Sequence, residues 1–323
     1  MVEVPTFKLN DSTSVPALAL GVNGQALKKV NDLTESLTAV LLKALEFGYR
    51  HIDTAEVYKT EVAIGNALQE AFATGLVKRE DVYVTTKITP SNLHIEEILP
   101  AIKRSLSNLQ LDYVDMYLIH FPLRLKKGVR LIDANLDDRL PLDLQSTWEE
   151  MEKLVTLGLT KSIGVSNFCV KKLQELLLHA KTIPAVNQIE LHPLWQQDKL
   201  RAYCQGKGIQ VSAWSPLGAP GSNFGTLNVL NNPILKQIAL EHQRSVAQIV
   251  LRWIHELGAI PIPRSSHEER LIENVSIWDF NLADEDHEKI KTVEQQSMFS
   301  VPEFIHRGKG VGIPTFAEFH DNG

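Results

Sequence analysis

Short apolar segments alternate with longer amphipathic segments along most of the chain. Eight of the short segments are rich in β-branched and other apolar residues, which is typical of parallel strands that are buried on both faces. They read ALALG from Ala17, RHID from Arg50, VYVTT from Val82, VDMYLIH from Val114, TKSIGVS from Thr160, AVNQIEL from Ala185, IQVSAWS from Ile209 and AIPIP from Ala259.

The segments between these strands repeat apolar residues every three or four positions, which predicts amphipathic helices. Residues 36–48, for example, place Leu37, Val40, Leu41 and Leu45 on one face. Further helices are predicted over residues 62–75, 95–109, 144–158, 170–180, 198–208, 232–243, 245–258 and 266–275. Many of them end at or near a glycine, as helix C-termini commonly do.

Eight consecutive strand–helix alternations favour an α/β fold of the (β/α)8 TIM barrel type. The alternative is a doubly wound sheet, which usually carries a GxGxxG motif after its first strand. Neither GVNGQ at residues 21–25 nor GAPGSNFG at residues 218–225 has that spacing. No linker-like composition divides the chain, so we expect one domain over residues 1–323, with a C-terminal loop over residues 297–323.

The composition is that of an ordinary soluble globular protein, with 44% hydrophobic and 22% charged residues. A net charge of −6 without a basic stripe argues against a nucleic-acid partner. We see no signal-peptide pattern and no apolar run of the ~18 residues that a membrane span needs, so we expect a cytoplasmic protein. Neither Cys169 nor Cys204 lies in a CxxC pattern, and no cluster of metal-ligand spacing occurs, so we expect neither disulfides nor a metal.

Polar residues stand where the predicted strands end, and in a TIM barrel the active site forms at the carboxyl ends of the strands. Asp53 ends the second strand and Tyr58 lies in the loop behind it, while Lys87 and His120 end the third and fourth strands. The later strands end at Ser166, Asn167, Gln188, Glu190, Trp214, Ser215, Arg264 and Ser265.

The first four of these residues suggest the reduction of a carbonyl group. A phenol can give its proton to a developing alkoxide, and a nearby ammonium group would lower the phenol pKa from about 10. Tyr58 and Lys87 fit these two roles, with Asp53 as the counter-ion of Lys87. His120 would orient the substrate oxygen. Two structural interpretations stay open: Asp53 as a helix cap and His120 as a core histidine.

Six segments of the chain together resemble the aldo-keto reductase family. They are GYRHIDTAEVYKTE, LSNLQLDYVDMYLIHFP, GVSNF, NQIELHP, SAWSPLG and IPRSSHEERLIEN, in family order between about Val15 and Phe280. The stretches WEEMEKLVTLGLTKSIGVSNF and HPLWQQDKLRAYC are most similar to the plant branch. That branch includes polyketide (chalcone) reductase, codeinone reductase, methylecgonone reductase and deoxymugineic acid synthase.

The resemblance implies a barrel whose base is closed by an N-terminal hairpin over residues 6–15. It also implies NADPH bound across the barrel mouth without a Rossmann motif. By position, Asp53, Tyr58, Lys87 and His120 match the catalytic tetrad of the family, with Tyr58 as the proton donor. Positions matching cofactor contacts are Ser166, Asn167 and Gln188 for the carboxamide, Trp214 for the nicotinamide ring, Ser215 and Leu217 for the pyrophosphate, Arg264, Ser265 and Arg270 for the 2′-phosphate, and Glu273 and Asn274 for the adenine.

The chain departs from the family pattern at several binding positions. Arg264 replaces the usual Lys and Trp214 the usual Tyr, which keeps a phosphate-binding cation and a stacking ring. Asn23, Thr89 and Phe121 stand where Trp is common, which predicts a wider and more polar substrate pocket. Phe304 and His306 match the variable C-terminal loop that contacts substrate in the family.

We therefore expect NADPH-dependent reduction of a ketone or aldehyde to an alcohol. The substrate would be a bulky or polar specialised metabolite of the alkaloid or polyketide type, in a plant, and the enzyme a monomer. Relatives that reduce carbon–carbon double bonds tend to carry Glu at the position of His120, so carbonyl reduction is favoured. The alternatives are a general aldehyde-detoxifying reductase and a non-catalytic NADPH-binding sensor or partner subunit.

Overall fold

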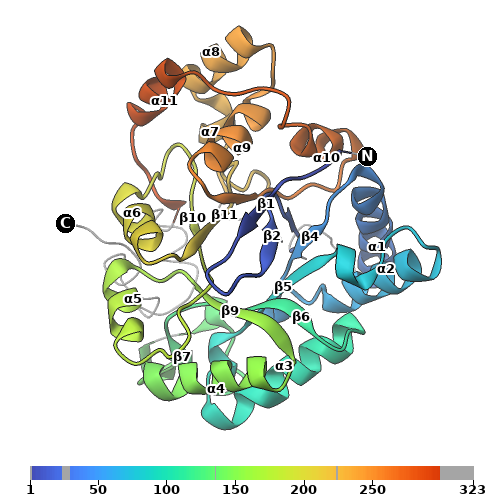
Figure 1. Ribbon diagram of the computed structural model, residues 1–323, viewed down its shortest axis with the longest axis vertical. Helices are drawn as coiled ribbons and strands as arrows, with labels where there is room; N and C mark the ends of the chain where they lie inside the picture. The colour runs from blue at the N-terminus through green and yellow to red at the C-terminus, as the bar shows by residue number, and fades with distance from the viewer. Residues whose placement is uncertain (1, 24–29, 135, 223–224, 299–323) are drawn as a thin grey trace.

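A computed structural model describes residues 2–23, 30–134, 136–222 and 225–298. Its helices surround a central set of strands, as the view along the barrel shows (Figure 1). The eight predicted strands are all present, as β3 (Leu20–Gly21), β4 (His51–Asp53), β5 (Tyr83–Ile88), β6 (Val114–Ile119), β9 (Thr160–Ser166), β10 (Val186–Glu190), β11 (Gln210–Trp214) and β12 (Ile260–Ile262).

These strands form one parallel sheet in the order β12-β11-β10-β9-β6-β5-β4-β3. The two outer strands of this order also meet. The backbone amides of Ala19 and Gly21 donate to the carbonyl oxygens of Pro261 and Pro263, at 3.0 Å and 2.9 Å. These hydrogen bonds close the sheet into a barrel, and the (β/α)8 prediction is confirmed.

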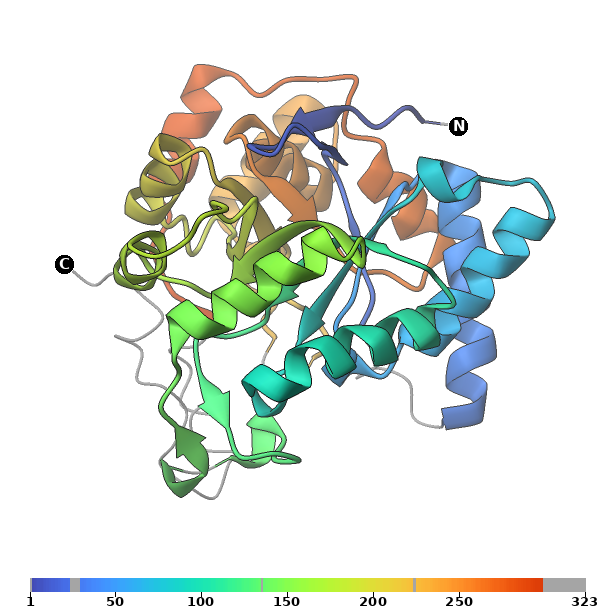
Figure 2. The same cartoon turned by 60° about the horizontal axis from the view of Figure 1, so that its bottom comes forward.

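The expected N-terminal hairpin is present as β1 (Thr6–Lys8) and β2 (Ser14–Pro16), which pair antiparallel. Leu9 and Val15 of this hairpin region share a buried cluster with Tyr83, Val186 and Ile260, which lie at the starts of their strands. The hairpin therefore covers the amino ends of the barrel strands, and it lies at the opposite end of the molecule from the segment around residues 124–140 (Figure 2). This leaves the carboxyl ends of the strands to form the site.

The predicted helices are all found, with small differences at their ends. They are α1 (Val30–Phe47), α2 (Glu61–Ala73), α3 (Ile95–Leu109), α4 (Leu144–Thr156), α5 (Val170–Leu177), α6 (Asp198–Gly206), α8 (Pro233–His242), α9 (Val246–Glu256) and α10 (Glu268–Val275). Helix α1 begins six residues before the predicted start, because its first turns are mostly polar and carry no apolar spacing. Gly48, after α1, has φ +107° and a Cβ there would lie 2.4 Å from the carbonyl oxygen of Val2, so this position requires glycine.

Two helices and two short strands were not predicted from the sequence. Helix α11 (Asp284–Lys291) consists largely of charged residues, so its apolar periodicity is weak. Helix α7 (Asn228–Asn231) is a single turn. Strands β7 (Arg124–Leu125) and β8 (Arg139–Leu140) form a short antiparallel pair between β6 and α4.

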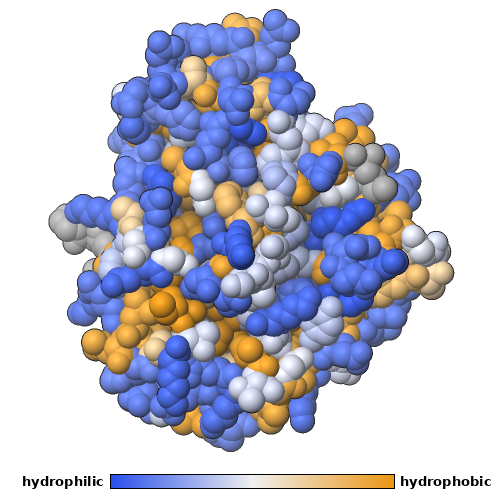
Figure 3. Space-filling model, in the orientation of Figure 1, coloured by the Kyte–Doolittle hydropathy of each residue, from blue (hydrophilic) through white to orange (hydrophobic). Residues whose placement is uncertain are grey.

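The core lies between the barrel and the surrounding helices. Trp148 of α4 and Trp253 of α9 are among the largest fully buried side chains, together with Tyr117 of β6. Polar and charged residues cover much of the visible surface, with smaller apolar patches between them (Figure 3). No helix within the described ranges combines the length and apolar character required to cross a membrane.

Candidate active site

Four predicted site residues meet at the carboxyl ends of neighbouring strands. Asp53 is the last residue of β4, Lys87 lies near the end of β5 and His120 directly follows β6. Tyr58 ends a short 3-10 helix, η2 (Glu56–Tyr58), between β4 and α2. Parallel strands end at the same rim of the barrel, so three strands and one loop deliver these side chains to one place.

Lys87 and Asp53 form a buried ion pair. The Nζ atom of Lys87 lies 2.6 Å from Oδ1 of Asp53 and donates a second hydrogen bond to the carbonyl oxygen of Thr54, at 2.7 Å. The other carboxylate oxygen of Asp53 accepts a hydrogen bond from Nε2 of Gln188, at 2.7 Å. Burial lowers the pKa of Lys87 from its usual value, and the Asp53 carboxylate opposes that shift. Asp53 is thus a counter-ion, not a helix cap.

Tyr58 and His120 face each other across the same rim. The hydroxyl oxygen of Tyr58 lies 3.3 Å from Nε2 of His120, and the two rings meet edge to face at 5.5 Å. Burial, together with the positive charge of Lys87, holds the pKa of His120 well below its usual range. His120 is therefore neutral near pH 7, which suits a group that hydrogen-bonds an uncharged carbonyl oxygen.

The expected lowering of the pKa of Tyr58 by Lys87 is wrong for this structure. Burial raises the pKa of Tyr58 above its usual value, and the Asp53 carboxylate raises it further. The Lys87 ammonium lies 5.5 Å from the centre of the Tyr58 ring, but Asp53 already balances its charge at 2.6 Å. Tyr58 consequently keeps its proton throughout the neutral range.

The residues matched to the nicotinamide site form a hydrogen-bonded chain beside the tetrad. Ser166 Oγ donates to the carbonyl oxygen of Gln188 at 2.8 Å, and Asn167 Nδ2 donates to the carbonyl oxygen of His120 at 2.9 Å. Trp214 Nε1 donates to Oδ1 of Asn167 at 2.9 Å. The amide of Asn167 thus lies against His120, the amide of Gln188 against Asp53 and the Trp214 indole against Asn167, a set suited to a flat, polar ring.

The residues matched to the 2′-phosphate lie around the start of α10. Arg264 and Ser265 connect β12 to this helix, and Arg270 lies in its first turns. Among the residues that the structure describes, neither Arg264 nor Arg270 has a hydrogen-bond or ion-pair partner for its guanidinium group, and both residues are exposed. Two unpaired guanidinium groups beside a helix N-terminus fit a phosphate.

The remaining predicted contacts have different environments. Ser215 and Leu217 follow β11, and Ser215 has a left-handed backbone with φ +52°. Glu273 is half-buried and Asn274 is buried, both on α10. Within the described ranges, no group of three or more His, Cys, Asp or Glu residues is arranged to hold a metal ion.

Three of the predicted substrate contacts can be placed. Phe121 stacks on His120 with the ring centres 4.8 Å apart, which puts its side chain beside the tetrad. Asn23 follows β3 and Thr89 follows β5, and both are half-buried at the carboxyl ends of their strands. Phe304 and His306 lie outside the described residues.

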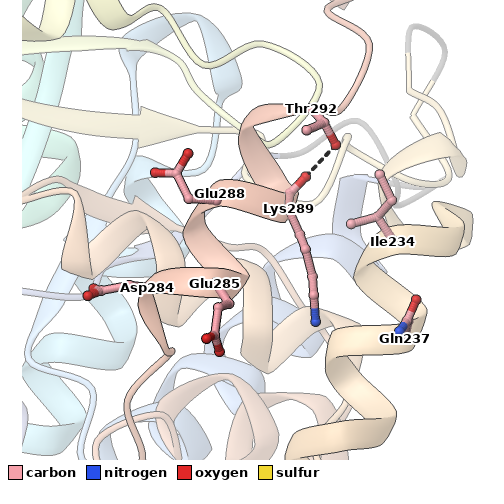
Figure 4. A pocket seen from close by; sticks show the side chains of 7 residues that line it. All are labelled: Ile234, Gln237, Asp284, Glu285, Glu288, Lys289 and Thr292. Carbon is pink, nitrogen blue, oxygen red and sulfur yellow. Dashed lines mark hydrogen bonds between the residues drawn. The ribbon is translucent and has the colours of Figure 1, made fainter.

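A surface hollow of about 560 Å³ lies away from this rim, between α8 and α11 (Figure 4). It is lined by Ile234, Gln237, Asp284, Glu285, Glu288, Lys289 and Thr292. All of these residues belong to α8 or α11 or directly follow α11. The hollow therefore contains none of the four tetrad residues.

Sequence reasoning did not single out two buried carboxylates that flank Tyr58, namely Glu56 and Glu61. Glu56 is 9% exposed and Glu61 is 2% exposed. Both lie in the segment TAEVYKTE, and a glutamate is rarely buried without partners. Charged residues on both sides of a candidate catalytic tyrosine were the signal available in the sequence.

Comparison with known proteins identifies relatives along nearly the whole chain. A family model described as "Aldo/keto reductase family" matches residues 17–295. Protein REDOX 2 of Catharanthus roseus is 42% identical over 306 residues, which cover 94% of each protein. NADPH-dependent codeinone reductase 1-5 of Papaver somniferum is 42% identical over 293 residues, covering 90% of each.

Solved structures agree with the sequence relatives. A Bombyx mori aldo-keto reductase crystallised in complex with NADP superposes with a TM-score of 0.85 at 35% identity, covering 98% of this chain and 100% of that one. The aldose reductase of Schistosoma japonicum gives a TM-score of 0.84 at 34% identity, covering 97% and 99%. At this identity and coverage the likeness extends beyond the barrel fold alone.

Proposed function

Because this chain belongs to the aldo/keto reductase family, we propose that it reduces a ketone or aldehyde to an alcohol with NADPH, using Tyr58 as the proton donor. The observation that carries this proposal is the pair formed by the Tyr58 hydroxyl and His120 Nε2, 3.3 Å apart at the barrel rim. Two neutral hydrogen-bonding groups at this spacing suit one carbonyl oxygen placed between them.

Each member of the tetrad has a distinct task in the proposed reaction. When bound, NADPH would supply the hydride that attacks the carbonyl carbon. Tyr58, protonated in the resting site, donates its proton to the carbonyl oxygen as negative charge develops there. An alkoxide is far more basic than a phenolate, so this transfer is favourable even with a raised tyrosine pKa. Lys87, held in place by Asp53, keeps an amine 5.5 Å from the centre of the Tyr58 ring, beside the phenolate that remains.

Residues next to the tetrad would hold the cofactor. The amide groups of Asn167 and Gln188 and the hydroxyl of Ser166 offer donors and acceptors for a carboxamide, and the Trp214 indole offers a stacking face. Ser215 and Leu217 would contact the pyrophosphate, with Glu273 and Asn274 near the adenine. Arg264 and Arg270 carry the preference for NADPH over NADH, because a 2′-phosphate gives each unpaired guanidinium group an anionic partner.

The substrate we propose is a bulky or polar specialised metabolite of the alkaloid or polyketide type. Several relatives carry names of this kind, including codeinone reductase of Papaver somniferum, rhazimal reductase 2 of Alstonia scholaris and 6′-deoxychalcone synthase of Glycine max. Asn23, Thr89 and Phe121 replace larger or less polar rings at the expected pocket wall, which gives room and hydrogen-bonding groups to such a substrate.

The test is NADPH oxidation by the purified protein against a panel of carbonyl compounds. The panel contains alkaloid ketones, polyketide ketones and short aliphatic aldehydes, with NADH as the cofactor control. Higher kcat/KM on bulky ketones supports the proposal. Best efficiency on short apolar aldehydes would favour a general aldehyde-detoxifying reductase instead. Tight NADPH binding without turnover of any carbonyl would favour a sensor or partner subunit.

A further inference from the structure

The proton donor stands on a short and weakly stabilised piece of backbone. Tyr58 is the last residue of η2, which has only three residues, and a single 3-10 turn has little stability of its own. The residue before η2, Ala55, provides no side-chain cap, and the residue after it, Lys59, has a left-handed backbone with φ +59°. Contacts from outside the turn must therefore fix where the Tyr58 hydroxyl lies.

One such contact comes from Glu56, the first residue of the same turn. Both of its carboxylate oxygens accept from Nδ2 of Asn92, at 2.8 Å and 2.9 Å. Asn92 ends η4 (Pro90–Asn92), the turn that follows β5, the strand of Lys87. Arg104 approaches Glu56 at 3.5 Å from a half-exposed position on α3. Glu56 thus links the turn that carries Tyr58 to the loop behind Lys87.

A second contact comes from Glu61, the first residue of α2, on the other side of Tyr58. Its Oε1 atom accepts from the hydroxyl of Thr86 at 2.8 Å, and its Oε2 atom accepts from Nδ2 of Asn108 at 3.1 Å. Thr86 directly precedes Lys87 in β5. The strand of Lys87 and its following loop are therefore fastened to the Tyr58 segment on both sides of the tyrosine.

Burying two carboxylates is costly unless hydrogen bonds compensate, and both are compensated largely by neutral side chains from β5, η4 and α3. We propose that Glu56 and Glu61 are positioning residues, which hold the Tyr58 hydroxyl at the distance from His120 and Lys87 that proton transfer requires. This inference rests on the proposed function. It deepens that function by assigning a role to two side chains that do not touch the reacting atoms.

The experiment compares Glu56→Ala, Asn92→Ala and the double variant, using the best substrate of the carbonyl panel. We expect each single change to lower kcat by roughly 10- to 100-fold, because a small misplacement of a reacting group has effects of this size. The kcat of the double variant should be no lower than that of the less active single variant, because both substitutions remove the same contact between Glu56 and Asn92. The isotope effect on kcat with deuterated NADPH should rise, while the Kd of NADPH stays within about twofold of the parent.

Two matched variants complete the design. Glu56→Gln retains an oxygen that can accept from Asn92 and should restore kcat to within about threefold of the parent. Glu97→Ala removes another carboxylate partner of Arg104, 3.8 Å away, without touching the Tyr58 turn, and should leave kcat unchanged. Unchanged kcat in Glu56→Ala would overturn the proposal. So would additive losses in the double variant, or a loss of NADPH affinity that matches the loss of kcat.

Failure of the proposed function gives a different result from failure of this inference. If the parent protein reduces no carbonyl compound, the catalytic proposal fails. The contact between Glu56 and Asn92 is then tested by measuring hydrogen exchange of the backbone amides in residues 54–62. Faster exchange there in Glu56→Ala, but not in Glu97→Ala, supports the positioning role. Equal exchange in both variants and the parent rules it out.

Discussion

The Nζ atom of Lys87 lies 2.6 Å from Oδ1 of Asp53, and both side chains are buried. Lys87→Met leaves the carboxylate buried without its cation, so we expect a loss of about 3–5 kcal/mol in the free energy of unfolding. The double variant Asp53→Asn with Lys87→Met should recover most of that loss while staying inactive. Urea unfolding checks both values, and equal stability of the single and double variants would contradict the pairing.

Removing the hydroxyl of Tyr58 tests the proton donor. Tyr58→Phe should lower kcat at least about 100-fold, because a general acid contributes that much or more. The residues proposed to hold NADPH lie on other elements, so the Kd of the cofactor should change less than about twofold. Steady-state kinetics and fluorescence titration measure the two quantities. Parent-like kcat would remove Tyr58 from the proposed role.

The pKa shifts at the rim predict a flat pH profile for reduction. The pKa of Tyr58 is raised and that of His120 is lowered, so neither group changes its charge between about pH 6 and pH 9. We therefore expect kcat/KM to vary less than about threefold over that range, measured with NADPH in excess. A midpoint near pH 7 that disappears in Tyr58→Phe would show that the tyrosine pKa is lowered in the working enzyme.

His51, at the start of β4, links stability to pH. Burial lowers its pKa to about 4, against about 6.5 in an unfolded chain. As the pH falls from about 6.5 to about 4, the unfolded chain takes up a proton at this residue and the folded chain does not, so stability decreases. Between pH 7 and pH 5 this single group accounts for about 2 kcal/mol. Urea unfolding of His51→Gln should show a dependence on pH that is weaker by that amount.

Arg264 and Arg270 are predicted to discriminate between the two nicotinamide cofactors. Replacing both with Met should weaken NADPH binding on the order of 100-fold, because two charge-assisted contacts are lost. NADH has no 2′-phosphate, so its Kd should change only slightly. Titrating each cofactor into the parent and the double variant gives the comparison. An equal increase in Kd for both cofactors would show that these arginines do not contact the 2′-phosphate.

The sequence was informative where the spacing of apolar residues directly reflects which faces of an element are buried. All eight strands of the barrel could be predicted because they are apolar on both faces, and strand ends then placed Asp53, Lys87 and His120 at one rim. Helix α11 was missed because few of its residues are buried, so its pattern is that of a polar loop.

The electrostatics of the site could not be predicted in the same way. The pKa of Tyr58 depends on how deeply its ring is buried and on how completely Asp53 neutralises Lys87, and neither quantity is visible in residue spacing. The contacts of Glu56 and Glu61 join residues 25 to 47 positions apart. Residues this far apart in sequence come into contact only once the strands have paired in the correct register, so sequence spacing does not reveal them.

The barrel is closed by hydrogen bonds between residues near the two ends of the sheet-forming sequence, from Ala19 and Gly21 to Pro261 and Pro263. A Cβ atom on Gly21 would lie 3.2 Å from Cγ2 of Ile262, so the two segments fit together with little room to spare. During synthesis on the ribosome, β3 can pair with the segment around β12 only after nearly the whole chain has emerged. Until then β3 has an unpaired edge, the kind of surface through which incompletely folded chains aggregate.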